Sequence, residues 1–331
     1  AERSESVRAY QEFLIGLSSL TVAAKNHSIV NGLVSHIEQR NDVDSEVPCV
    51  MIIALVEGRY KVSIPFDEFY QKNPIDMATV NMETKAGREE YVNRCATMAA
   101  KLYSLNVPMV ITTIQVDEST DAEAGVPAYV IVASRKAALD IIEEANYGDR
   151  PDGDGPRIQE GDFVRAQITS VARDSIAVVV GGVDTRVSLH ALTFEYLVDA
   201  RTKYKVGQEI MVQVEQIIKE KVGHHNVEVN CKQPELERAK QMRSALPIGS
   251  IVFGIVSSVA ASKKQPGNIN VFAYIKMYDL PVLVNNMPAK FLGSEPPRGS
   301  TVRLKVLNYL DNGMILCRCI GTQGPMNFPN A

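Results

Sequence analysis

The 331-residue chain contains no tryptophan, five cysteines, and no uninterrupted apolar run of the ~18–20 residues that a membrane-spanning helix needs. Five scattered cysteines do not make a disulfide framework, so we expect free thiols and a reducing compartment. The first residues have neither the basic start nor the apolar stretch of a secretory signal. We therefore expect a soluble, cytoplasmic protein that does not bind membranes.

The sequence also lacks the motifs of common catalytic and cofactor sites, among them a phosphate loop, a GxSxG elbow and an HExxH helix. His224 and His225 have no cysteine or carboxylate at metal-ligand spacing, which favours a polar turn. Cys317 and Cys319 alternate on one strand face, and two small buried residues explain them better than a metal site. We expect a non-enzymatic protein that needs no metal or other cofactor.

Positive charge is scarce except in the last third of the chain. Residues 1–157 carry 15 basic and 24 acidic side chains, residues 158–245 carry 12 of each, and residues 246–331 carry 8 and 3. Neutralised phosphates supply much of the affinity for nucleic acids, so a nucleic-acid-binding region is usually basic. The last third alone has that balance.

The strongest feature present is an internal repeat. Three segments align without gaps, at residues 29–37, 163–171 and 251–259, and each alternates apolar residues through a small one, Gly32, Ala166 or Gly254. A second match, with apolar residues at two-two-three spacing, begins at residues 107, 210 and 302. A hairpin lies between the two matches and a closing strand follows them. Each copy predicts five short strands, so the fold class is mainly β, with three consecutive five-stranded barrels.

Helical spacing appears between these strands. Tyr91, Cys95, Met98 and Leu102 predict a helix over residues 88–104, inserted in the first copy, and Val7, Tyr10, Leu14 and Leu17 predict another near the N-terminus. We expect the following organisation: an N-terminal helix at 1–27, a barrel with a helical insert at 28–147, a linker at 148–157, a barrel at 158–233, a connecting helix at 234–245, and a degenerate barrel with a C-terminal tail at 246–331.

The second copy resembles a known family. The stretch from Gly161 to Val171, with Gly181-Gly182-Val183 and Val206-Gly207-Gln208-Glu209, is similar to the S1 domain, the OB-fold RNA-binding module of the largest protein of the bacterial small ribosomal subunit. The first copy, at Lys61 to Phe66 and Ala133 to Ala138, resembles S1 proteins of Gram-positive bacteria and their phages. The resemblance implies barrels whose outer faces stack and hydrogen-bond single-stranded RNA.

Members of this family carry two rings on the second strand and often a histidine at the end of the third. In the second copy these positions hold Asp174, Ala177 and Ser188, and its outward set is polar and nearly neutral: Arg165, Gln167, Thr169, Met211, Gln213 and Glu215. The third copy has Tyr274 at a ring position and Asn285 at the histidine position. The third copy is therefore the expected contact surface.

Strand alternation assigns the faces of the third copy. Ile269, Val271, Ala273, Ile275 and Met277 should point inward, while Phe272, Tyr274, Lys276 and Tyr278 point outward together, and Arg303 and Lys305 point outward from the fourth strand. Rings for bases beside cations for phosphates are the chemistry of a single-strand-binding face. The candidate nucleic-acid-binding residues are Phe272, Tyr274, Lys276, Asn285, Arg303 and Lys305. The alternative is that the rings pack against a neighbouring domain or subunit.

Two functions from different classes follow. The first is a non-enzymatic protein that binds RNA or another single-stranded nucleic acid through S1-like OB domains. The second is an architectural protein, such as a component of a phage head or tail, in which OB barrels contact other protein subunits. The net charge of -4 and the ring-less second copy favour the second function, while the resemblance and the third copy favour the first.

Overall fold

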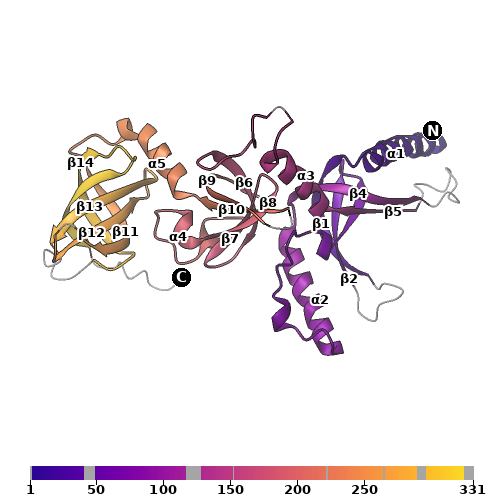
Figure 1. Cartoon of the computed structure of the whole chain (residues 1–331), viewed down its shortest axis with the longest axis horizontal. Helices are drawn as coiled ribbons and strands as arrows, with labels where there is room; N and C mark the ends of the chain where they lie inside the picture. Colours follow the sequence, from indigo (N-terminus) through magenta and orange to yellow (C-terminus); the bar gives the residue numbers. More distant parts are fainter. Residues whose placement is uncertain are drawn as a thin grey trace.

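The computed structural model describes residues 2–40, 49–116, 128–151, 153–220, 223–263, 265–288 and 296–323. Three five-stranded sheets, in which most strand pairs are antiparallel, lie in a row along the long axis of the molecule (Figure 1). The first and third close into barrels with the strand orders β1-β2-β3-β5-β4 and β11-β12-β13-β15-β14. The second has the order β10-β9-β6-β7-β8, and Thr185 Oγ1 donates to Val227 O at 2.7 Å across its seam. The predicted fold class is confirmed.

The strands follow the repeat. The first barrel contains β1 (Ile29–Arg40), β2 (Cys49–Val56), β3 (Tyr60–Pro65), β4 (Asn106–Val116) and β5 (Tyr129–Ser134). The second contains β6 (Phe163–Val171), β7 (Ser175–Val180), β8 (Val183–Ser188), β9 (Glu209–Lys219) and β10 (His225–Asn230). The third contains β11 (Ile251–Ala261), β12 (Asn268–Ile275), β13 (Leu280–Pro288), β14 (Thr301–Tyr309) and β15 (Ile315–Gln323). The predicted C-terminal tail lies outside the described residues.

The described residues form five α-helices around the barrels: α1 (Glu2–Lys25), α2 (Lys85–Ala99), α3 (Arg135–Tyr147), the one-turn α4 (Leu189–Leu192) and α5 (Lys232–Gln241). The predicted insert before the fourth strand is confirmed, since α2 continues into a 3-10 turn, Ala100–Leu102, directly ahead of β4. Helix α3 joins the first barrel to the second, and α5 joins the second to the third (Figure 1). Within the described residues, no helix has the length and apolar character to cross a membrane.

The first strand of every barrel bends at the same repeat position. The pairing register with the second strand shifts between Val34 and His36 in β1, Ile168 and Ser170 in β6, and Val256 and Ser258 in β11. The residue at each shift carries a hydroxyl, which donates to a main-chain carbonyl of the next strand. These bonds are Ser35 to Ile53, Thr169 to Ala177 and Ser257 to Phe272, at 3.2, 3.4 and 3.1 Å. The bulge curves the strand so that it can pair with both of its neighbours.

The small residue in the middle of each first strand is explained by close packing. A Cβ added to Gly32 would lie 2.7 Å from the side chain of Met109, and one added to Gly254 would lie 2.9 Å from that of Leu304. Ala166 occupies the equivalent position and is buried. A small residue within an alternating apolar strand predicts a close approach of another backbone, but here side chains of the fourth strand make the close contact.

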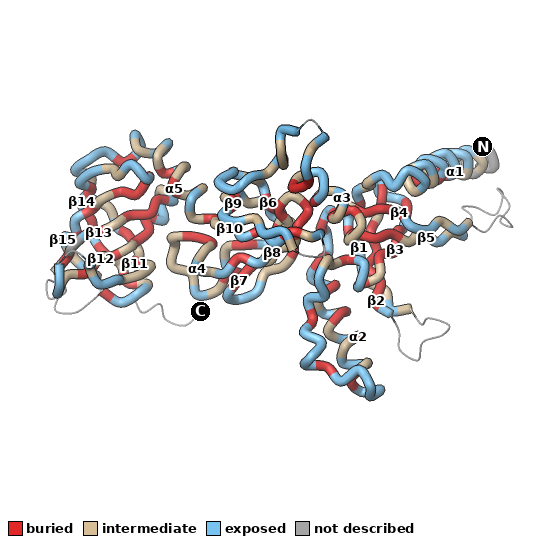
Figure 2. The backbone as a smooth tube through the Cα atoms, in the orientation of Figure 1, coloured by how far each residue is buried: buried red, intermediate tan, exposed pale blue. Residues whose placement is uncertain are grey.

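Buried residues recur along the strands of all three barrels (Figure 2). Two predicted faces are wrong. In α1 the buried residues are Phe13, Leu17 and Leu20, and Leu14 is exposed, because Phe13 packs its ring 5.2 Å from the rings of Tyr60 and Tyr129. Met277 was expected to point into the third barrel but is 84% exposed, because β12 ends at Ile275 and strand alternation ends with it.

Candidate nucleic-acid interface

A pocket of about 340 Å³ lies between the second and third barrels. One wall is the chain that connects β8 to β9, and the other is the outer surface of β11 and β12. Its lining residues are Leu189, His190, Thr193, Phe194, Glu195, Tyr196, Leu197, Lys232, Ser257, Ser258, Phe272 and Arg298. Among them are three aromatic rings, one lysine and one arginine.

The three rings come from both barrels. Phe194 and Tyr196 are two residues apart in the β8–β9 connection, and Phe272 stands on β12, opposite Ser258 of β11. All three are half-buried, so part of each ring faces the pocket. Tyr196 packs on the third barrel at Gly299, whose φ is +81° and where an added Cβ would lie 2.9 Å from the ring. The pocket can therefore offer ring surface to a flat apolar group such as a base.

Lys232 and Arg298 supply the positive charge. The Nζ atom of Lys232 lies 5.0 Å from the centroid of the Phe194 ring, which is a cation–π distance. Burial lowers the pKa of Lys232, while nearby Glu235 acts in the opposite direction. Arg298 is exposed at the end of the loop before β14. A phosphate placed between these two side chains would gain charge-assisted hydrogen bonds and would favour the charged form of Lys232.

The carboxylates near the pocket are already engaged. Glu235 of α5 accepts hydrogen bonds from Thr193 Oγ1 and from the main-chain nitrogen of Phe194, which anchors the ring-bearing connection. Burial raises the pKa of Glu235 even though both hydrogen bonds act to lower it. Glu195 lies 2.8 Å from Nζ of Lys203 and 3.8 Å from Nζ of Lys276. The negative charge of Glu195 is thus balanced by lysines of both barrels.

Tyr274 does not present its ring to solvent, contrary to the sequence prediction. Its side chain points away from the core of the third barrel, yet the residue is 1% exposed. Lys203 of the second barrel lies 5.6 Å from the ring centroid, and the hydroxyl donates to Asp279 Oδ1 at 3.3 Å. Burial raises the pKa of this hydroxyl. The alternative interpretation, packing against a neighbouring domain, is therefore the right one for Tyr274.

The other residues predicted on β12 and β13 remain accessible. Phe272 lines the pocket, Lys276 is exposed at the seam between the barrels, and Asn285 is exposed on β13. Phe272 pairs with Leu283, two residues before Asn285 on the same side of β13. Tyr278, expected to point outward, is half-buried against the core of the third barrel.

Arg303 and Lys305 point outward from β14, as strand alternation predicts, and both are exposed. They do not stand beside the β12 residues, because β11 separates β14 from β12 in the sheet. Their cross-strand neighbours on β11 are Phe253 and Ile251, which are 54% and 52% exposed. The structure therefore buries Tyr274 and separates Arg303 and Lys305 from the predicted residues of β12 and β13, so the expectation of one aromatic row beside a basic pair is wrong.

The predicted outward set of the second barrel is accessible with one exception. Thr169 is buried at the bulge of β6, where its hydroxyl donates to the main-chain oxygen of Ala177. Arg165 and Met211 are exposed on β6 and β9. Arg165 lies 3.8 Å from Glu209. Ala177 on β7 pairs with Arg186 on β8, so no ring stands at that position.

Four of the five residues that supply the rings and the positive charge of the pocket were not predicted from the sequence: Phe194, Tyr196, Lys232 and Arg298. One signal was available, since Phe194-Glu195-Tyr196 places two rings at alternate positions in an irregular segment. Nothing in the sequence shows that this connection faces the third barrel. That depends on how α5 sets the angle between the two barrels.

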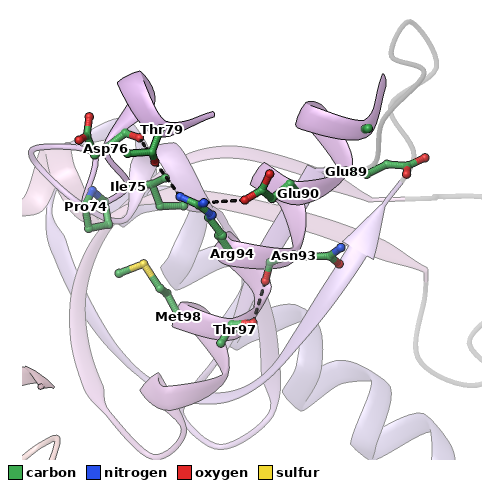
Figure 3. Close-up of a pocket in the computed structure, with 11 residues that line it drawn as sticks. Pro74, Ile75, Asp76, Thr79, Glu89, Glu90, Asn93, Arg94, Thr97 and Met98 are labelled. Atoms are coloured by element: carbon green, nitrogen blue, oxygen red, sulfur yellow. Dashed lines mark hydrogen bonds and ion pairs between the residues drawn. The ribbon is translucent and has the colours of Figure 1, made fainter. Parts of the chain in front are cut away.

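A larger hollow of about 670 Å³ lies between α2 and the loop before it (Figure 3). Its charged lining is mostly acidic, with Asp76, Glu89 and Glu90. The one arginine that lines it, Arg94, is held by Glu90 and by Thr79 Oγ1 at 2.5 and 2.7 Å. This charge disfavours a phosphate-bearing ligand, so the smaller pocket between the barrels is the better candidate.

Two further predictions need correction. His225 is not in a polar turn; it begins β10, is buried, and lies with His224 beside Glu143 of α3, which precedes His225 by 82 residues. The spacing of all five cysteines predicts buried strand and helix positions. Cys49 is exposed, whereas Cys95, Cys231, Cys317 and Cys319 are buried as predicted.

Some solved structures are similar to this chain. No curated protein matches the sequence. The solved structures similar to the chain include the a/eIF2alpha–aDim2p–rRNA complex from Pyrococcus horikoshii OT3, with 16% identity over 25% of this chain and 56% of that chain and a TM-score of 0.21. They also include a multidomain protein with nucleic acid binding domains from Streptococcus pneumoniae TIGR4, with 12% identity over 89% of this chain and 74% of that chain and a TM-score of 0.23. This chain thus spans little more than half the length of the first.

A family match covers part of the chain. Residues 157–223 match the family described as the S1 RNA binding domain. These residues contain β6, β7, β8 and β9 and the ring-bearing connection that forms one wall of the pocket. The resemblance found in the second copy of the repeat is confirmed: over residues 157–223 this chain is similar to the S1 RNA binding domain.

Proposed function

We propose that this protein binds RNA or another single-stranded nucleic acid without catalysing a reaction, and that the pocket between the second and third barrels holds part of the strand. The observation that carries the proposal is the joint lining of this pocket by Phe194, Tyr196 and Phe272 with Lys232 and Arg298. The similarity of residues 157–223 to the S1 RNA binding domain supports it, because those residues supply one wall.

In this proposal the rings stack on bases and the cations neutralise phosphates. Each stacked base contributes ~1–3 kcal/mol and depends little on sequence, because every base has a π-face. Each neutralised phosphate of a single strand contributes ~0.7 to the slope of log affinity against log salt. Ser257 and Ser258 add hydroxyls at the pocket wall that can bond a sugar or phosphate.

Arg303 and Lys305 extend the proposed footprint along a second face of the third barrel. Arg303 pairs with Phe253 and Lys305 pairs with Ile251 on one side, and Lys305 pairs with Arg318 on the other. This face therefore has three exposed cations beside an exposed ring, which suits the backbone of a strand leaving the pocket.

The test is fluorescence anisotropy with a labelled single-stranded RNA, measured in low and in high salt. We expect wild-type protein to bind in low salt, and Lys232→Ala and Arg298→Ala each to weaken binding and to reduce the salt slope by up to ~0.7. Arg165→Ala is the matched control, since it removes an exposed arginine of the second barrel outside the pocket. Equal losses in all three variants would place binding outside the pocket.

The architectural alternative is favoured by one observation. Ile251, Phe253 and Leu307 expose 52%, 54% and 43% of their surface on one face of the third barrel, and exposed apolar groups are typical of protein interfaces. If wild-type protein binds no single strand even in low salt, the nucleic-acid proposal fails. Arg303→Ala together with Phe253→Ala would then be expected to impair association between subunits, measured by sedimentation.

A further inference from the structure

A polar cluster lies where the first and second barrels meet. Glu143 of α3 is a buried carboxylate whose Oε1 accepts from the main-chain nitrogen of His225 and lies 3.0 Å from its Nδ1. These two contacts fix the orientation of the carboxylate. The second oxygen, Oε2, is thereby directed toward His224.

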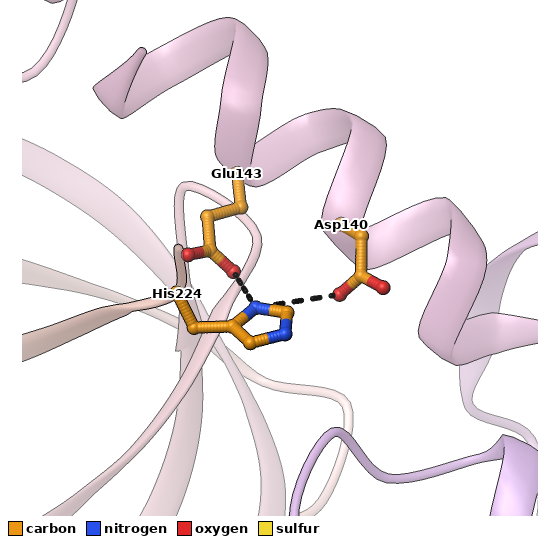
Figure 4. Close-up of side chains that lie close together, drawn as sticks. All are labelled: Asp140, Glu143 and His224. Carbon is orange, nitrogen blue, oxygen red and sulfur yellow. Dashed lines mark hydrogen bonds and ion pairs between the residues drawn. The ribbon is translucent and has the colours of Figure 1, made fainter. Parts of the chain in front are cut away.

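Three potential ligand atoms converge at this point (Figure 4). His224 Nδ1 lies 3.4 Å from Glu143 Oε2 and 3.9 Å from Asp140 Oδ1, and all three atoms lie within 4.8 Å of one another. Asp140 and Glu143 are three residues apart on α3, so both carboxylates project from the same side of the helix. His224 precedes β10 of the second barrel.

The two carboxylates have no Lys or Arg as an ion-pair partner within the described residues. Between them lies the side-chain amide of Gln71, whose Nε2 donates to Asp140 Oδ1 at 3.2 Å and to Glu143 Oε2 at 3.0 Å. Its Oε1 accepts from the main-chain nitrogen of Asp184 at 3.0 Å, which sets the direction of the amide. In the described part of the chain, the groups that contact these two carboxylates are thus N–H donors and imidazole rings, and neither a lysine nor an arginine neutralises their charge.

We propose that Asp140, Glu143 and His224 bind one divalent transition-metal ion, and that zinc fits them best. Ligands held ~2.1 Å from a tetrahedral zinc ion are ~3.4 Å apart, close to the separations around His224 Nδ1. One imidazole with two carboxylates favours zinc and similar metals over calcium or magnesium, which prefer oxygen ligands alone. His225 acts behind Glu143 as an orienting partner, as residues behind metal ligands commonly do.

The ion would link parts of the chain that are distant in sequence. Helix α3 follows β5 of the first barrel directly, whereas His224 belongs to the β9–β10 connection of the second barrel. His224 and Asp140 have partly exposed side chains, at 42% and 39%, so water can complete the coordination. Bound metal therefore fixes the first barrel against the second, and this proposal does not depend on nucleic-acid binding.

The test is calorimetric titration of zinc into the full, chelator-treated and reduced chain, in a Cys49→Ser background that removes the exposed thiol. We expect one ion per chain, and at least a tenfold loss of affinity in His224→Ala. His36→Ala is the matched control, because His36 is also partly exposed and lies 3.0 Å from a single carboxylate, Glu38. It should bind zinc as the background does.

Asp140→Asn gives a second variant that keeps an acceptor for Gln71 and removes the charge; it too should lose at least tenfold in affinity. Zinc should raise the unfolding temperature of the background protein but not that of His224→Ala. Cobalt in place of zinc should give no thiolate charge-transfer band. Equal binding by His224→Ala and the background, less than one ion per chain, or a thiolate band with cobalt would overturn the proposal.

Discussion

Phe272 and Tyr274 are two residues apart on β12, both were predicted to stack on bases, and the structure gives them opposite roles. Phe272 is half-buried at the pocket, whereas Tyr274 is 1% exposed between the barrels. Replacing Phe272 by alanine should remove one stacking surface and weaken single-strand binding by ~1–3 kcal/mol, or about 5- to 150-fold. Its effect on stability should be small, since part of the ring is already in water.

Tyr274→Ala should act on folding instead. Truncation of a fully buried aromatic side chain costs ~3–5 kcal/mol, and this one also loses its contact with Lys203 and its hydrogen bond to Asp279. Tyr274→Phe keeps the ring and loses the hydrogen bond alone, which should cost ~0.5–1.5 kcal/mol. Chemical denaturation measures the stability of each variant, and fluorescence anisotropy with labelled RNA measures its binding.

The two rings should therefore affect different assays. Phe272→Ala should lose affinity while it keeps most of its stability, and Tyr274→Phe should change neither by much. A Tyr274→Ala protein with unchanged stability and weakened binding would show that its ring is accessible to bases. A Phe272→Ala protein that binds as the wild type does would remove the pocket from the binding surface.

Two further predictions concern the fold. Gly182 has a φ of +97°, and an added Cβ would lie 2.7 Å from the carbonyl oxygen of Leu139 in α3. Gly182→Ala should therefore lower the free energy of unfolding by ~1–2 kcal/mol through backbone strain and by a further ~1–3 kcal/mol through the clash with α3. Gly267→Ala is the control, because its φ is +87° and no atom lies within 4 Å of the added Cβ, so it should show the backbone strain alone. Equal losses of stability in the two variants, measured by chemical denaturation, would contradict the close contact between Gly182 and α3. Burial raises the pKa of Cys231 and Cys317 to about 12 and that of Cys95 to about 11, which leaves almost no thiolate at pH ~8. A thiol reagent should therefore modify Cys49 quickly in the native protein and all five cysteines after denaturation, and rapid native modification of more than one would contradict this.

The barrels could be predicted from the sequence because strand alternation and bulges are local. Gly32, Ala166 and Gly254 mark the same point of three first strands, and the register shifts follow three residues later in each. The alternation on β12 likewise gives the correct side for Phe272 and Tyr274. The prediction for Met277 failed because the strand ends at Ile275, and strand ends are weakly encoded.

The parts that failed depend on contacts between barrels. Alternation places Tyr274 outside its own barrel but carries no information about Lys203, which covers it from the second barrel. His224 looked isolated because its carboxylate neighbours, Asp140 and Glu143, lie on a helix that precedes the second barrel. Arg303 and Phe272 were predicted on one surface because strand alternation shows which face of a sheet a residue lies on. It does not show the order of the strands, and β11 lies between β14 and β12.

The helices that join the barrels also couple their folding. The three hydrophobic cores are separate clusters, yet Tyr147 at the end of α3 belongs to the core of the second barrel, and Ala239 of α5 belongs to that of the third. Each barrel is then a cooperative unit of its own, and its unfolding removes the packing of the helix residue that belongs to its core. Heat or denaturant should unfold such a chain in overlapping steps, and a single midpoint temperature would average over units of different stability.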